Sequence, residues 1–436
     1  EGNGALLNIF FSIVLAMPVL VKSLVSFSII ILCSKLLKNL AIAIILGTGV
    51  LAVWSGHSLL SSLSIAWERF YALDNFSLLM LILCVIWLSS QMQQTGIMKN
   101  LVENINNRLS QKASLAVLPA VIGLLPMPGG ALFSAPLVDG CDMDGELSSI
   151  TKTRINYWFR HIWEYFWPLY PAVLLTVDIT RLPIWKFMVL QFPIFLLMIF
   201  IGYWFILRKL PKKEKVSVQR NGSLIKYLSP ILMVVLVYAV ISLFFPALEK
   251  VSKYLPMLIG LVTSIIYLQI IRPLTAQQWK GILLSKKAPT MAILVAATRI
   301  YGAFIEARLP DGVLLMEKMS QELDLLGIPP LILILFISFL SGITTGLGVG
   351  FVGASFPIMM VLLGQNPSEA TFLSTVVLAY ASGQIGQLNS PMHVCLVVTN
   401  QHFGTGLLQS LSSIFKPVLA LLTGVIVYSS ILYLVL

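Results

Sequence analysis

Ionisable side chains gather in one segment of an otherwise apolar sequence. Residues 154–171, RINYWFRHIWEYFWPLYP, hold two arginines, a histidine and a glutamate among many aromatic rings. On a helix, Arg154, His161 and Glu164 share one face, and Arg160 lies within ion-pair reach of Glu164. Ionisable groups inside a membrane are costly and mark substrate or proton routes. We therefore expect Arg154 or Arg160 to bind an anionic substrate group, and His161 and Glu164 to carry protons.

Two structural interpretations of the same segment stay open. In the first, Arg160 and Glu164 form a buried ion pair, supported by His161, and this network holds a broken helix together. In the second, Arg154 snorkels from a cytoplasmic helix end to the membrane surface. The aromatic rings are typical of lipid-facing packing, with one or two walling a site: Tyr157, Trp158, Trp163, Tyr165, Trp167 and Tyr170.

A second polar segment, AYASGQIGQLNSPMHVCLVVTN, covers residues 379–400. Two glycines and Pro391 predict a break in this helix, lined by Gln384, Gln387, Asn389, Ser390 and His393. Unwound carbonyls with Asn and Ser oxygens suit a sodium ion, whereas a histidine offers a proton site. We expect Asn389 and Ser390 to contact substrate, and Gln387 and His393 to take part in ion coupling. A purely structural histidine is the alternative.

The stretch GLLPMPGGALFSAPLVD, residues 123–139, interrupts an apolar region with prolines and glycines. Irregular backbone at membrane depth survives only where protein or a watery cavity covers it. We expect a hairpin tip at which the Gly129–Gly130 backbone, with Ser134 nearby, faces an anion at the start of a half-helix. A plain kink or surface loop is the alternative.

A comparable interruption, SGITTGLGVGFVGASFP, covers residues 341–357. Gly342, Gly346 and Gly350 recur every four residues, which is typical of close helix packing. Hydroxyls at a hairpin tip can also coordinate ligands, so Thr344 and Thr345 are candidate substrate contacts. A sodium site is expected near Ser341, Thr345 and Asn389.

The composition places these segments in a membrane. Of 436 residues, 58% are hydrophobic and 11% are charged, against about 25% charged in soluble proteins. Runs of about 20 apolar residues are long enough to span a bilayer. We predict spans at 13–34, 39–55, 75–93, 153–179, 184–207, 227–246, 254–271, 288–305, 371–400 and 406–434, with residues 5–16 as an extension or a separate short helix.

Loop charge orients the spans and excludes a nucleic-acid partner. The net charge of +11 comes from lysines and arginines in short segments between apolar runs, the positive-inside pattern of a cytoplasmic face. Placing every basic loop in the cytoplasm requires both interrupted regions to be re-entrant, the first from the cytoplasm and the second from outside. The acidic stretch DGCDMDGE, residues 139–146, is expected to be a solvated cytoplasmic turn.

The order of elements repeats at an offset of roughly 220 residues, and five spans per half make the repeats inverted. We predict an all-α polytopic membrane protein with a first repeat at 1–207 (hairpin 114–138, broken helix 153–179). A basic cytoplasmic linker at 208–226 leads to a second repeat at 227–436 (hairpin 328–362, broken helix 371–400). The four cysteines are expected to be buried thiols, and Arg299 to reach the cavity or pair with an acidic group.

The four segments quoted above, taken in order, resemble the prokaryotic family of domain of unknown function 401. That family is similar to the wider ion transporter superfamily, which includes dicarboxylate, citrate, gluconate and arsenite carriers and the large subunit of TRAP transporters. The resemblance implies two inverted repeats, each with a re-entrant hairpin and a broken helix, and often a homodimer with elevator movement. The Ser-Asn-Thr signatures of the sodium-dicarboxylate branch are absent, with only Ser341, Thr344 and Thr345 loosely similar.

These observations favour a secondary transporter of the cytoplasmic membrane that moves an organic anion with H⁺ or Na⁺. The expected partners are a small anionic substrate, membrane lipid and a second copy of the chain, and no cofactor beyond the coupling ion is expected. The alternatives are a TRAP-like subunit that needs a binding protein, a membrane-embedded enzyme acting on a lipid-linked substrate with His161 and Glu164 as acid and base, and an ion channel.

Overall fold

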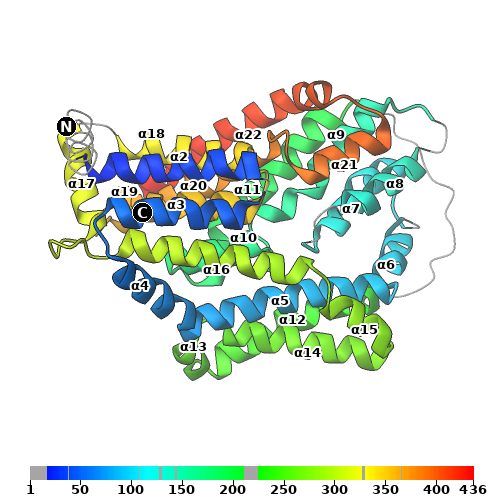
Figure 1. Cartoon of the computed structure of the whole chain (residues 1–436). Helices are drawn as coiled ribbons and strands as arrows, with labels where there is room; N and C mark the ends of the chain where they lie inside the picture. Colours follow the sequence, from blue (N-terminus) through cyan, green and yellow to red (C-terminus); the bar gives the residue numbers. More distant parts are fainter. Residues whose placement is uncertain are drawn as a thin grey trace.

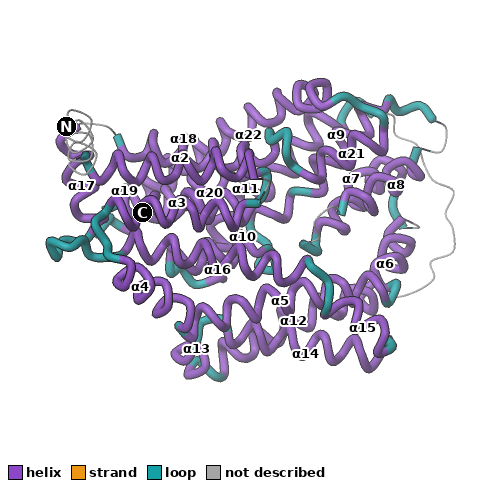
Figure 2. Tube along the Cα trace, viewed as in Figure 1, coloured by secondary structure: helices purple, strands orange, loops and turns teal. Residues whose placement is uncertain are grey.

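The computed structural model describes residues 17–37, 39–106, 108–126, 130–142, 145–210, 224–326, 329–364 and 366–436. In these ranges the chain is helical, without named strands (Figures 1 and 2). Five helical stretches are long and apolar enough to cross a membrane: Asn75–Gln94, Ile184–Leu207, Leu224–Phe244, Ala276–Glu306 and Leu407–Val435. Shorter apolar helices accompany them, as the prediction of an all-α polytopic membrane protein requires.

The first repeat runs from α2 to α11. Its simple helices are α2 (Val19–Leu37), α3 (Leu40–Trp54), α4 (Leu59–Tyr71), α5 (Leu73–Gln94) and α6 (Ile97–Asn106). A hairpin of α7 (Gln111–Gly123) and α8 (Ala131–Cys141) follows. A broken helix comes next, made of α9 (Ser149–Arg160), the 3₁₀ turn η1 (Ile162–Tyr165) and α10 (Pro171–Thr180). The last span is α11 (Ile184–Gly202), which continues into the π-helical turn η2 (Tyr203–Leu207).

The second repeat presents the same order. It contains α12 (Leu224–Phe244), α13 (Ala247–Val251), α14 (Leu255–Ile271), α15 (Ala276–Leu283), α16 (Lys287–Glu306) and α17 (Leu315–Leu326). The hairpin is α18 (Pro330–Thr345) with α19 (Gly348–Leu362), the broken helix is α20 (Glu369–Leu388) with α21 (Val394–Phe403), and α22 (Leu407–Val435) ends the chain. Both repeats therefore contain the predicted re-entrant hairpin and broken helix.

The two hairpins enter the protein from opposite ends. In Figure 1, α7 and α8 come from the end where α6 and α15 lie, and α18 and α19 come from the end where α17 lies. Two segments singled out in the sequence cannot be compared in full with the structure. The apolar stretch 5–16 lies outside the described residues. The basic linker 208–226 lies mostly outside them, because residues 211–223 are not described.

Local sequence explains where the broken helices stop and resume. In the first, α9 ends at Arg160 and the chain re-enters a helix at Pro171, whose fixed φ and missing N–H suit the first helical position. In the second, α20 ends at Leu388, Pro391 follows, and α21 starts at Val394. The second half of each broken helix ends at a residue with left-handed backbone: Arg181 (φ 57°) after α10 and Gly404 (φ 67°) after α21.

Hairpins and broken helices of the two repeats interlock. The half-helix α10 of the first repeat packs on α19 of the second, and α21 of the second packs on α8 of the first. Within the second repeat, Gly342 of α18 faces Gly383 and Gly386 of α20, where an added Cβ would overlap backbone atoms. The predicted close packing at this glycine is confirmed. This interlocking brings both helix breaks and both hairpin tips to one place.

Candidate functional site

A cavity of about 120 Å³ lies where the breaks and tips meet. Its polar lining comes from both repeats: Arg160, Glu164, Tyr170, Gln384, Gln387, His393 and Cys395. The remaining walls are largely apolar, with Ile86, Met291, Leu294, Leu347, Val349 and Val394 among them. The site therefore combines one permanent cation and one carboxylate with an apolar chamber.

Arg160, the last residue of α9, supplies the permanent positive charge. The residue is 2% exposed, and its side chain contacts the hydroxyl of Tyr170. Its guanidinium also lies against Gly130, where an added Cβ would overlap it. Gly130 at the first hairpin tip therefore makes room for the arginine, while Gly129 lies outside the described residues.

Glu164 joins the two repeats. Its Oε2 accepts a hydrogen bond of 2.7 Å from Gln387 Nε2, and its Oε1 lies 3.8 Å from His161 Nε2. Its backbone carbonyl accepts bonds from Tyr380 (2.8 Å) and Gln384 (3.2 Å). The carboxylate is therefore positioned by the Gln387 amide of the opposite repeat, and the backbone of Glu164 by Tyr380 and Gln384.

The histidines of the two breaks touch each other. The Nε2 atoms of His161 and His393 lie 2.9 Å apart, and both rings are buried. The Nδ1 of His161 lies 2.5 Å from the carbonyl of Tyr157, and the Nδ1 of His393 lies 2.6 Å from that of Gly346. Cys395 completes the cluster, because its Sγ and a nitrogen of each ring all lie within 4.8 Å of one another.

The hydrogen bonds at the tips obey the internal symmetry. The Tyr170 hydroxyl donates to the carbonyl of Gly123, and His393 bonds to the carbonyl of Gly346. Tyr170 and His393 are 223 residues apart in the sequence, and Gly123 and Gly346 are separated by the same number. Likewise, Tyr157 donates to the Leu388 carbonyl at 2.9 Å. Its counterpart Tyr380, again 223 residues on, donates to the carbonyl of Glu164. Each repeat thus closes the helix break of the other.

Several predicted residues lie away from the cavity lining. Arg154 donates to the carbonyl of Phe205 at 3.0 Å, near the end of α11. The hydroxyls of Thr344 and Thr345 donate to carbonyls of their own helix, Leu340 and Ser341 respectively, both at 2.7 Å. The structure thus brings Arg160, Glu164, Gln387 and His393 to the cavity. His161 contacts His393 next to this lining.

The other predicted residues also have local surroundings. Asn389 donates to the carbonyl of Ile385 (2.8 Å), and Ser390 donates to that of Ile343 (2.6 Å) and so ties the break to the hairpin tip. Ser134 and Ser341 are buried, and their hydroxyls have no hydrogen-bond partner among the described residues.

Sequence reasoning underestimated Tyr380 and Cys395. The cysteine is a buried free thiol, as expected, but it also joins His161 and His393 in a group whose ligand atoms lie within 4.8 Å of one another. The spacing of the histidines gave no sign of this group, since it forms only when the repeats interlock. The signal that could have found Tyr380 is its 223-residue offset from Tyr157.

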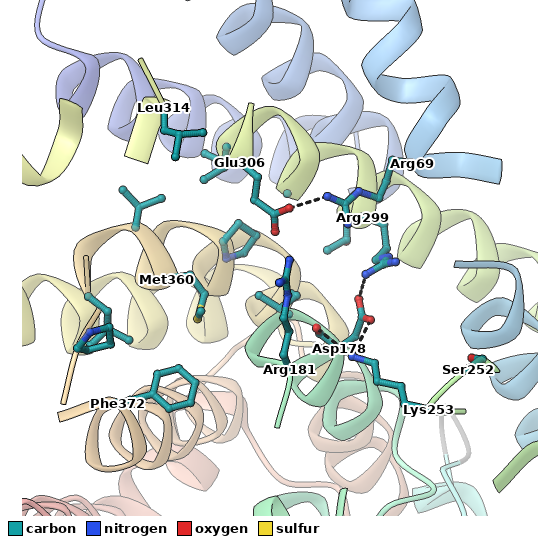
Figure 3. A pocket seen from close by; sticks show the side chains of 18 of the residues that line it. Arg69, Asp178, Arg181, Ser252, Lys253, Arg299, Glu306, Leu314, Met360 and Phe372 are labelled. Carbon is teal, nitrogen blue, oxygen red and sulfur yellow. Dashed lines mark hydrogen bonds and ion pairs between the residues drawn. The ribbon is translucent and has the colours of Figure 1, made fainter. Parts of the chain in front are cut away.

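A second, larger pocket of about 930 Å³ lies at the far end of α10 (Figure 3). Asp178 is held there by an ion pair with Arg299 of α16, by Lys253 at 3.3 Å and by the hydroxyl of Tyr254. Arg69 and Glu306 form a further pair at 2.6 Å on the rim. Of the two expectations for Arg299, the acidic partner is therefore the observed one.

The acidic turn after α8 is solvated at Asp139, Gly140, Gly145 and Glu146, as expected, but not at Asp142. Asp142 is buried, accepts bonds from the backbone N–H groups of Glu146 and Leu147, and lies 2.9 Å from Lys152. Burial raises the pKa of the Asp142 carboxyl, but the hydrogen bonds from Lys152 and the backbone outweigh it and hold this pKa below its usual value. This carboxylate braces the hairpin base against α9.

A family model described as "Protein of unknown function (DUF401)" matches residues 20–436. The chain belongs to this family. The DUF401 fold is similar to a solved structure described as "Crystal structure of the Alcanivorax borkumensis YdaH transporter reveals an unusual topology". The TM-score is 0.56 and the identity 12%, over 84% of this chain and 86% of that chain. At this identity the likeness concerns the fold alone. Comparison with curated proteins finds no match.

Proposed function

We propose that this DUF401 protein is a secondary active transporter that moves a small organic anion, of the carboxylate type, across the cytoplasmic membrane. The observation that carries the proposal is the placement of Arg160. Its charge lies at a cavity built from both helix breaks, beside the hairpin tip at Gly130. Buried cations at the midplane junction of inverted repeats are typical of substrate sites in carriers. The structurally similar YdaH protein is described as a transporter, which agrees with this proposal.

The cavity limits the kind of anion. Its volume of about 120 Å³ is below the range of about 300–1,000 Å³ of drug-sized sites. Arg160 and Tyr170 line it together with the other polar side chains named above, and the rest of its lining is apolar, including Leu294 and Val349. A short carboxylate with an apolar body fits this distribution best. We assign anion binding to Arg160 and not to Arg154, whose guanidinium is bonded near the end of α11.

Coupling to H⁺ or Na⁺ belongs to the same proposal. His161, Glu164 and His393 form a connected set of ionisable groups, with Gln387 holding the carboxylate. The sodium alternative is supported by the buried hydroxyl of Ser341, which has no hydrogen-bond partner within the described part of the chain. We propose that the protein works as a homodimer by an elevator movement. In such a movement the link from Asp178 to Arg299 would break and form again, because it joins a broken helix to α16.

A ligand screen followed by an uptake assay tests the function. Thermal shifts across a series of short carboxylates, with and without sodium and at two pH values, identify the anion. Uptake of that anion into proteoliposomes then compares wild type with Arg160→Ala. Arg154→Ala is the matched control, because it removes the other arginine of the same helix. We expect uptake to be lost in Arg160→Ala and kept in Arg154→Ala. Unchanged uptake in Arg160→Ala would remove this arginine from the site.

A further inference from the structure

The two histidines at the helix breaks each have one ring nitrogen committed to a carbonyl. A carbonyl oxygen only accepts hydrogen bonds, so the Nδ1 atoms that face Tyr157 and Gly346 must carry hydrogens. In a neutral imidazole the other nitrogen is then an acceptor. Both Nε2 atoms of neutral His161 and His393 would therefore present lone pairs.

These two nitrogens face each other at 2.9 Å, the distance of an N–H···N hydrogen bond. Two acceptors at this distance repel each other, whereas one added proton converts the contact into a charge-assisted hydrogen bond. We propose that His161 and His393 bind a single proton between their Nε2 atoms, and that this proton is the coupling ion. The second half of the statement rests on the transport function proposed above.

The surroundings of the pair are consistent with one added proton. Tyr157 packs its ring edge-on to both imidazoles. Glu164 places a carboxylate oxygen 3.8 Å from His161 Nε2 and supplies a counter-charge. The Cys395 thiol lies within 4.8 Å of a nitrogen of each ring, but it has one hydrogen and can satisfy one nitrogen at most. Among the described residues, Arg160 and Tyr170 are the further ionisable groups in the lining of the adjoining cavity.

Proton binding changes the charge of the cavity. Arg160 and Glu164 offset each other, so the unprotonated site is close to neutral and the protonated site carries about one positive charge. The proton comes from water and returns to it, and no other bond changes. An anion in the cavity and a proton on the histidines must then strengthen each other's binding equally. We expect about a tenfold or larger gain in anion affinity when the pair is protonated.

A transition metal is the competing occupant, since His161, His393 and Cys395 form a three-donor group. Two nitrogens about 2.0–2.1 Å from a tetrahedral metal lie roughly 3.3 Å apart. The observed 2.9 Å is closer, as a shared proton requires. The buried guanidinium of Arg160 also opposes a divalent cation at this place.

Nitrogen-15 NMR of the imidazoles tests the proposal directly. The chain has four histidines, so a His57→Gln/His402→Gln background in lipid nanodiscs leaves only the pair. We expect both Nδ1 atoms to be protonated at all pH values. A scalar coupling between the two Nε2 atoms should disappear in a single one-proton step as the pH rises. His161→Gln or His393→Gln should remove that coupling.

Three results would overturn the shared proton. They are the absence of Nε2–Nε2 coupling at every pH, an Nε2–H tautomer on either neutral ring, and stoichiometric binding of added Zn²⁺ to both rings. Transport is scored separately in proteoliposomes. If the Nε2–Nε2 scalar coupling is observed but no anion is taken up, the proposed transport function is wrong and the proton site stands. Uptake that is indifferent to pH, without those signals, would sink the proton site and leave the transporter.

Discussion

The guanidinium of Arg160 packs against Gly130 and occupies the space that a side chain at residue 130 would fill. The arginine ends α9 and the glycine precedes α8, so the contact joins the first helix break to the first hairpin tip. The positive charge at the centre of the cavity depends on this glycine.

Gly130→Ala should therefore weaken anion binding. Its methyl group would displace the guanidinium and disturb a charge-assisted hydrogen bond worth about 1.5–3 kcal/mol, so we expect a loss of roughly tenfold or more in affinity. Gly140→Ala, near the other end of α8, is the matched control, because nothing lies within 4 Å of its added Cβ. The affinity is measured by the ligand-induced thermal shift. Equal affinities in the two variants would contradict the claim that anion binding depends on the space that Gly130 leaves for Arg160.

Asp178→Asn should destabilise the fold strongly. The carboxylate is buried between Arg299 and Lys253, and removing one partner of a buried ion pair costs about 3–5 kcal/mol. Asp311→Asn is the control, since the Asp311–Lys318 pair is exposed and exposed ion pairs contribute little to stability. Unfolding by denaturant in detergent micelles measures both variants. A loss for Asp178→Asn no larger than the control's would mean that the link is not structural.

The turn at Asp142 should make stability depend on pH on the acid side. Its folded pKa lies below the unfolded value of about 3.9, so the stabilisation is fully present above the unfolded pKa. It is lost as the pH falls through the folded pKa. The difference in the free energy of unfolding between wild type and Asp142→Asn should therefore shrink as the pH is lowered from 7 to 3. A constant difference over this range would argue against a charged Asp142 in the folded protein.

The sequence predicted the scaffold well because its signals are local. Apolar runs indicated the spans, and prolines and glycines indicated both hairpin tips and both breaks. Arg160, Glu164, Gln387 and His393 were candidates for the same reason, as polar groups at predicted interruptions. Arg154 was a candidate on helical periodicity alone, and the structure places it against the Phe205 carbonyl.

Contacts between the repeats were beyond such reasoning. The pairing of His161 with His393, and of Glu164 with Gln387, joins residues more than 220 positions apart. The partner of Arg299 was equally open, because Asp178 lies 121 residues away. Periodicity fixes which face of a helix a residue occupies, but the helix that packs against that face is decided by the tertiary fold.

Gradient-driven accumulation in proteoliposomes is the sharpest test of proton-coupled anion transport through Arg160. The identified carboxylate is added outside the vesicles under an inward proton gradient without sodium, and in parallel under a sodium gradient without a pH difference. We predict accumulation above equilibrium under the proton gradient in wild type and Arg154→Ala, and none in Arg160→Ala. Failure of wild type to accumulate the anion under either gradient, or full accumulation in Arg160→Ala, would refute this transport function.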